Sequence, residues 1–151
     1  MRVVGWPIAL LLSTTLCFAA SLPKPTKTEY LISTGAGFIM SKEEGAMYAM
    51  NYEVRKPFPG PVYCVALFES PIPRDAPLSK EFTVAPEAKD IELRSTGFHA
   101  IHNGHRYTVR LLLYLDAEHT KLLAEHDQGV LFSAPRGQLG QLRDQFGLDV
   151  Q

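Results

Sequence analysis

The strongest constraint on the fold is a set of short runs in which apolar and polar residues alternate. In the run AMYAMNYEV at 46–54, one face carries Tyr48, Met50, Tyr52 and Val54. Alternation with a period of two is typical of a β-strand that buries one face and exposes the other. The sequence therefore predicts β-sheet for this part of the chain.

Proline-rich segments separate this run from further strand-like runs. RKPFPGPVY interrupts the chain after the first run, and ESPIPRDAPLSKE is a long polar loop. Between them, VYCVALF at 62–68 is apolar on both faces, which predicts a central strand buried between two layers. FTVA and DIELRST are typical of short strands on either side of PEAKD. Strand runs separated by turn residues favour a sandwich over an α/β fold.

We therefore expect an all-β fold, an immunoglobulin-like β-sandwich of about seven strands with a short inserted helix and a short C-terminal helix. A small β-barrel is the alternative. The inserted helix is predicted to begin at Asp116 as its N-cap and to end at residues 126–129. The C-terminal helix is predicted from the spacing of Leu139, Leu142 and Phe146, which forms one apolar stripe.

Residues 1–20 resemble a secretory signal peptide. The stretch begins with one positive charge, continues through an apolar run and ends in small residues at Ala19 and Ala20. The alternative is an uncleaved membrane anchor, but the apolar run is shorter than the roughly 20 residues that a spanning helix needs. We therefore predict cleavage near Ala20, export to the periplasm or the extracellular space, and a single domain over residues 21–151.

Charge and cysteine content restrict the partners and the stabilising chemistry. The chain has 15 basic and 16 acidic residues, so no basic excess is present to neutralise nucleic acid phosphates. Of the two cysteines, Cys17 lies in the predicted signal peptide and Cys64 in a predicted strand. A thiol that persists unpaired in an oxidising compartment is usually buried, so we expect Cys64 to be structural.

The segment FHAIHNGHRYTV at 98–109 predicts a β-hairpin. Asn-Gly at 103–104 is a strong signal for a two-residue type I′ turn. In that register His102 pairs with His105, and Ala100 pairs with Tyr107. The residues of the two flanking strands that are then predicted to face the core are Phe98, Ala100, Tyr107, Val109, Leu111, Leu113 and Leu115.

This hairpin places His102 and His105 side by side as candidate metal ligands. Cβ atoms of paired residues lie about 5 Å apart, so two imidazoles can share one ion. A zinc site needs three or four ligands, and the third would have to come from another loop, for instance from His119 or His126. We prefer the structural interpretation, a solvent-exposed turn with polar neighbours, over a site for zinc or copper.

Other candidate chemistry is sparse. STGAGF at 33–38 lacks the third glycine of a nucleotide-binding loop and is interpreted as a bend between strands. His126 and Asp127 suggest acid–base chemistry, but no recognisable motif places a serine or cysteine nucleophile near them. The sequence indicates no cofactor, and an enzyme is the third of the functional hypotheses.

The first hypothesis is a non-catalytic interaction module that recognises another envelope or extracellular protein. Its proline-rich loops or an edge strand would contact that protein. The second hypothesis is a protein that binds a small ligand or a metal ion at the His102/His105 turn. Neither nucleic acid nor a membrane span after signal cleavage is expected.

Overall fold

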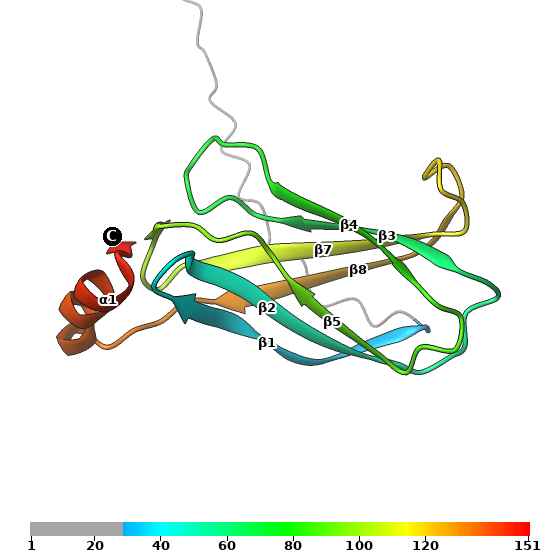
Figure 1. The fold of residues 1–151 in the computed structure, drawn as a ribbon, viewed down its shortest axis with the longest axis horizontal. Helices are drawn as coiled ribbons and strands as arrows, with labels where there is room; N and C mark the ends of the chain where they lie inside the picture. The colour runs from blue at the N-terminus through cyan, green and yellow to red at the C-terminus, as the bar shows by residue number, and fades with distance from the viewer. Residues whose placement is uncertain (1–28) are drawn as a thin grey trace, which may run out of the picture.

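The computed structural model describes residues 29–151, which form three β-sheets, and the two larger ones pack face to face (Figure 1). The predicted signal peptide at 1–20 lies outside the described residues. The first sheet has the order β1-β2-β5 and consists of Leu31–Ser41, Gly45–Val54 and Asp90–Arg94. The second has the order β4-β3-β7-β8 and consists of Leu78–Val84, Val62–Phe68, Arg106–Tyr114 and Leu122–Leu131.

The prediction of a β-sandwich with about seven strands is confirmed. All neighbouring strands within the two sheets are antiparallel, and the division into three and four strands is that of immunoglobulin-like sandwiches. The fourth strand, β4, pairs with β3 and not with β5. Within residues 29–151 the two sheets stay separate, so the alternative of a closed barrel is not observed.

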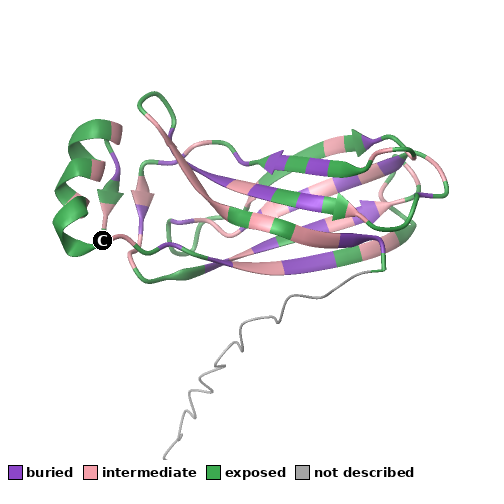
Figure 2. Ribbon diagram, turned by 90° about the horizontal axis from the view of Figure 1, so that it is seen from below, coloured by how far each residue is buried: buried purple, intermediate pink, exposed green. Residues whose placement is uncertain are grey.

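The alternation predicted for the strands is visible along both sheets. Figure 2 shows buried and more exposed bands following one another along the strands. Tyr48, Met50 and Tyr52 of β2 are at most 1% exposed, whereas Val54 at its end is half-buried. The buried residues of β7 are Tyr107, Val109, Leu111 and Leu113. The two inner faces together form one hydrophobic core.

Tyr48 joins the two sheets at one end of this core. Its ring lies 5.2 Å from that of Phe68 and 6.0 Å from that of Tyr107, between ring centroids, and both residues belong to the opposite sheet. Its hydroxyl donates a hydrogen bond of 2.7 Å to the backbone carbonyl of Glu69. Burial, with smaller contributions from Tyr107 and Glu69, raises the pKa of Tyr48. The hydroxyl therefore remains a donor across the physiological pH range.

The predicted inserted helix at 116–129 is wrong, because this segment forms a hairpin of β7 and β8. Asp116 caps the turn: its carboxylate accepts the N–H groups of Thr120 at 3.0 Å and Lys121 at 2.6 Å. The hydrogen bond from the Thr120 hydroxyl is the main cause of the lowered pKa of Asp116. Strand β8 pairs with β7 over its length, from Leu122 to Leu131. This tertiary pairing outweighs a local pattern that suits either structure.

The predicted hairpin at 98–109 is also wrong in its strand pairing. Strand β6, Ala100–Ile101, pairs in parallel with β9, Asp149–Val150, while β7 lies between β3 and β8. As a result Ile101 is buried and Ala100 is half-buried, the reverse of the expected faces. Leu115, expected in the core, follows the end of β7 and is 42% exposed.

The predicted C-terminal helix is confirmed as α1, Leu139–Phe146, which follows a short 3-10 turn at Arg136–Gln138. It lies at one end of the sandwich (Figure 1). Leu142 and Phe146 pack against the core from this end. Gly147 ends the helix in the left-handed conformation, at φ 61°. No helix in residues 29–151 is long and apolar enough to cross a membrane.

The Cys64 thiol is expected to react with a thiol reagent only after denaturant is added. The residue is 1% exposed, and burial raises the pKa of the thiol to about 12. Because the thiolate is the reactive form, both inaccessibility and the raised pKa slow the reaction. Absorbance of a released chromophore, followed with and without denaturant, measures this. Rapid labelling of the native protein would contradict the burial of the Cys64 side chain on the inner face of β3.

Candidate functional site

His102 and His105 occupy the two ends of one tight turn and do not face each other across paired strands. The N–H of His105 donates to the carbonyl of His102 at 3.4 Å. Gly104 has a φ of 78°, whereas Asn103 has a negative φ, so the turn is not of type I′. The Asn103 side chain instead bonds the backbone of Ala134 with both its amide groups, at 2.8 and 3.1 Å. The turn is thus fixed to the segment after β8.

Each of these two histidines has a structural contact. The Nε2 atom of His105 lies 2.9 Å from Oε1 of Glu69, and both side chains are partly exposed. The other carboxylate oxygen of Glu69 accepts the N–H of Thr108 at 2.8 Å. The backbone N–H of His102 donates to the hydroxyl of Tyr107 at 2.8 Å. These contacts connect the turn to β7 and to the end of β3.

The other three histidines lie elsewhere in the fold. His99 follows the Phe98 bridge, and its Nδ1 atom approaches Gly45. His119 lies in the β7–β8 turn at a φ of 56°, with its ring centroid 5.0 Å from that of Tyr114. His126 faces the core from β8, where its ring meets the ring of Tyr52 at 5.3 Å. The five histidines therefore do not form a cluster.

Zinc or copper at low micromolar concentration is expected to leave the melting temperature unchanged. Among the described residues, no three His, Cys, Asp or Glu side chains are grouped so as to hold a metal ion. An ion present at 100 times its dissociation constant would add about 2.7 kcal/mol of stability, which a thermal shift detects.

The double variant His102→Ala/His105→Ala is the control for this titration. A metal-dependent shift in the parent that disappears in this variant would support a metal site at the turn and contradict the structural interpretation. A shift that persists would place the ion at another site.

His126 and Asp127 do not form an acid–base pair, because consecutive residues of a strand point to opposite faces. Asp127 lies on the outer face and binds Arg110 through two hydrogen bonds of 2.8 and 2.9 Å. Glu125 also contacts the Arg110 guanidinium, at 3.0 Å. The helix end predicted at residues 126–129 is wrong, because His126 lies within β8.

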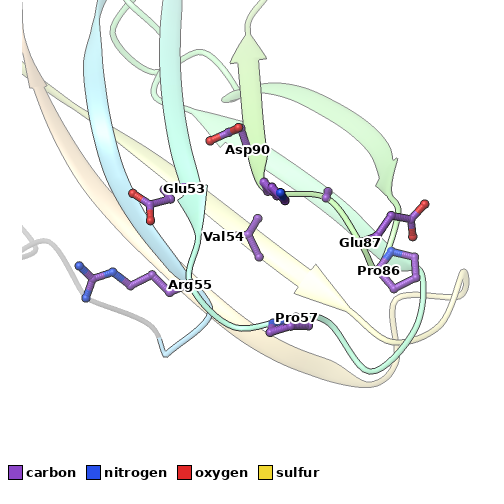
Figure 3. Close-up of a pocket in the computed structure, with 9 residues that line it drawn as sticks. Glu53, Val54, Arg55, Pro57, Pro86, Glu87 and Asp90 are labelled. Atoms are coloured by element: carbon purple, nitrogen blue, oxygen red, sulfur yellow. The ribbon is translucent and has the colours of Figure 1, made fainter.

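A hollow of about 540 Å³ lies between the proline-containing loops at one end of the sandwich (Figure 3). Val54, Pro57 and Pro86 are among its lining residues. The charged groups of Glu53 and Glu87 lie apart and point away from each other in this view. A catalytic or ion-binding site needs charged groups that converge on one point. The carboxylates of Glu53 and Glu87 therefore do not share one site in this hollow.

The outer face of the four-stranded sheet is apolar over three neighbouring strands, and we call it the outer apolar face. Cross-strand pairing aligns its members in rows. They are Tyr63, Val65 and Leu67 of β3, Leu112 and Tyr114 of β7, and Leu122 of β8. The first five are half-buried and Leu122 is 51% exposed. No described helix or further sheet covers them.

This finding corrects the expectation that β3 is buried between two layers. Its inner face, with Val62, Cys64, Ala66 and Phe68, is buried as expected, but its outer face meets solvent. Carboxylates border the outer apolar face: Glu81 pairs across from Val65, and Glu125 pairs across from Leu112. Apolar residues on both faces of β3 were the sequence signal for a covered surface.

A second apolar surface lies where β1 faces β8, and we call it the β1–β8 groove. Its volume is about 280 Å³. It is lined by Phe38 and Met40 of β1, by Leu131 of β8 with Phe132, Ser133, Ala134 and Pro135 after it, and by Gln138 and Leu142 at the C-terminal helix. The sequence analysis missed this groove, because its walls come together only in the folded chain.

No protein-family model, no curated protein and no solved structure matches the chain. The site must therefore be interpreted from its own geometry.

Proposed function

We propose that the protein is an exported, non-catalytic interaction module that recognises another protein of the envelope or the extracellular space. The observation that carries this proposal is the outer apolar face. Outward positions of a two-layer sandwich are ordinarily polar, because they meet water. Here three consecutive outward residues of β3, at positions 63, 65 and 67, are apolar.

The composition of this surface suits a protein partner. Tyr63 and Tyr114 lie opposite each other, and tyrosine is enriched where proteins contact one another. An apolar centre with a polar rim is the usual anatomy of such interfaces. The carboxylate of Glu81 at the rim disfavours phosphate groups, which supports a protein over a nucleic acid or an anionic lipid surface.

The described polar groups support recognition over catalysis. Glu69 holds His105 and the backbone of Thr108, and Arg110 holds Asp127 and Glu125. These charges are engaged in pairs that stabilise the sheet surface. An active site would instead hold a nucleophile, a base and an oxyanion donor around one position.

Site-specific photocrosslinking tests this proposal. A photoreactive amino acid at Val65 of the mature protein is expected to capture one protein from an envelope or secreted fraction. Val65→Lys, which charges the same face, should abolish the complex of the unlabelled protein with the captured partner. Asn51→Lys charges an exposed position on the other sheet and should leave that complex intact. Equal binding by both variants would contradict recognition by the outer apolar face.

Export is tested on the same material. The intact mass of the secreted or periplasmic protein should correspond to a chain that begins at or near Ser21. A mature protein that retains residues 1–20 would contradict cleavage, and a protein found only in the cytoplasm would contradict export.

A further inference from the structure

The hydrophobic core is open to solvent along the β1–β8 groove. Phe38 pairs across from Tyr48 and Ala36 pairs across from Met50, so both lie on the inner side of the first sheet. Phe38 packs its ring against Tyr48 at 4.8 Å and Phe132 at 5.5 Å, yet it is only half-buried. Ala36, although on the inner side, is exposed. The inner side of β1 therefore reaches water.

The walls of the groove carry no charge. None of its nine lining residues is Asp, Glu, Lys, Arg or His. In contrast, the hollow between the proline-containing loops has five charged residues among its nine. A charged side chain inserted into the β1–β8 groove would lose hydration without gaining a counterion. The groove therefore selects apolar side chains.

The neighbouring edge strand, β1, is equally uncharged. Its 11 residues, LISTGAGFIMS, contain no charged residue and no proline. The other edge strands carry charges: Lys80 and Glu81 in β4, Asp90, Glu92 and Arg94 in β5, and Glu125 and Asp127 in β8. Charges and prolines on edge strands normally prevent the addition of a further strand. Among the four edges of the two packed sheets, β1 alone lacks this protection in its sequence.

We propose that β1 and the β1–β8 groove bind an extended, uncharged segment of a partner protein by strand addition. The backbone of the segment pairs with the edge of β1 from Gly35 to Ser41, which no described strand occupies, and its alternate apolar side chains enter the groove beside Phe38 and Met40. This site is separate from the outer apolar face, so it goes beyond the function proposed above. Affinity comes from main-chain hydrogen bonds, and specificity comes from the apolar side chains.

The occupant is a separate segment rather than β1 of a second copy. In a pair of β1 strands, each strand would still have its Phe38 and Met40 on the inner side of its own sheet, next to its own groove. Those side chains are therefore not free to fill the groove of the other copy. A segment with unengaged side chains both pairs with the edge and fills the groove.

Binding of designed peptides to the mature chain tests this site. Four fluorescent probes alternate threonine with valine, leucine, isoleucine or phenylalanine over eight residues and carry lysines only at their ends. Fluorescence anisotropy is expected to show saturable binding for at least one of them. The same probe with its two central threonines replaced by proline should bind at least tenfold more weakly, because proline removes a backbone donor.

Charged variants locate the binding. Ala36→Lys at the exposed edge and Leu131→Lys, at a groove position that is 50% exposed, should each weaken binding at least tenfold. Ser79→Lys at an exposed position of the β4 edge is the matched control and should change it less than twofold. Thermal unfolding by circular dichroism verifies that each variant is folded.

Each remaining outcome would overturn the proposal. These outcomes are the failure of all four probes to bind, equal binding of the proline probe, and binding that neither Ala36→Lys nor Leu131→Lys weakens. A dimer in light scattering that Ala36→Lys dissociates would assign the edge to a second copy. Val65→Lys on the outer apolar face should leave probe binding unchanged, so failure of one site is distinguishable from failure of the other.

Discussion

Leu111→Ala is expected to lower the free energy of unfolding by about 2–5 kcal/mol, the range found for buried leucines. Leu111 is fully buried in the middle of β7, where it pairs across from Ala66 of β3 and His126 of β8. Truncation removes apolar contacts and leaves a cavity that rigid neighbouring strands cannot close. Equilibrium unfolding in denaturant measures the difference.

Leu112→Ala is the matched control, since the same residue type is truncated one position along the same strand. Leu112 points to the outer apolar face and is half-buried. Its loss should cost less than half as much, because water replaces the lost contacts and no cavity forms. Equal destabilisation by both substitutions would contradict the assignment of inner and outer faces on β7.

Gly45→Ala is expected to destabilise the fold by an amount similar to that of Leu111→Ala. Gly45 has a φ of 75°, and a side chain in the left-handed region costs about 1–2 kcal/mol. A Cβ atom would also lie 2.3 Å from the carbonyl oxygen of Phe98 and 2.8 Å from Nδ1 of His99. Relieving such an overlap costs about 1–3 kcal/mol. Thermal and denaturant unfolding should both report the loss.

Gly37→Ala separates this effect from the general cost of changing a strand glycine. A Cβ atom at Gly37 would meet no atom within 4 Å, and its φ is not in the left-handed region. Alanine there reduces the freedom of the unfolded chain and should leave stability unchanged or raise it slightly. A loss at position 37 as large as that at 45 would show that the overlap with Phe98 is not the cause.

The faces of the long strands were predictable because their signal is local. Alternation in β2 and β7 identified Tyr48, Met50, Leu111 and Leu113 as buried residues. The sandwich followed from several such runs and the proline-rich loops between them. These predictions needed no knowledge of which strand pairs with which.

Two of the wrong predictions have different causes: the segment 116–129 locally suits either a helix or a hairpin, whereas the strand partner of residues 100–101 lies far away in the chain. The segment from 116 to 129 has leucines that suit a helix turn, yet Leu122 pairs across from Tyr114 in a hairpin. Asn-Gly at 103–104 does form a turn, but the backbone carbonyl of Ile101, just before the turn, accepts the N–H of Gln151. A local pattern contains no information about a partner 50 residues away, so the long-range bonds could not be anticipated.

The two proposed binding surfaces also differ in how far the sequence could predict them. Val65 and Leu67 belong to a run that is apolar on both faces, so a covered surface on each side of β3 was predictable. The sequence did not predict that no described segment covers the outer face of β3. The β1–β8 groove brings together Phe38, Leu131 and Leu142. STGAGF, interpreted as a bend, is in fact part of β1, with a register shift between Ser33 and Gly35.

The uncharged edge of β1 also has a kinetic consequence. Two of the five strand pairs in the packed sheets, β2 with β5 and β3 with β7, join segments that are far apart in the chain, and all-β sandwiches fold in milliseconds to seconds. During that interval β1 is available to any extended chain nearby, including unfolded copies of the same protein. Refolding therefore competes with aggregation, and its yield should fall as the protein concentration rises. Ala36→Lys should therefore raise the refolding yield while it weakens the binding proposed for β1.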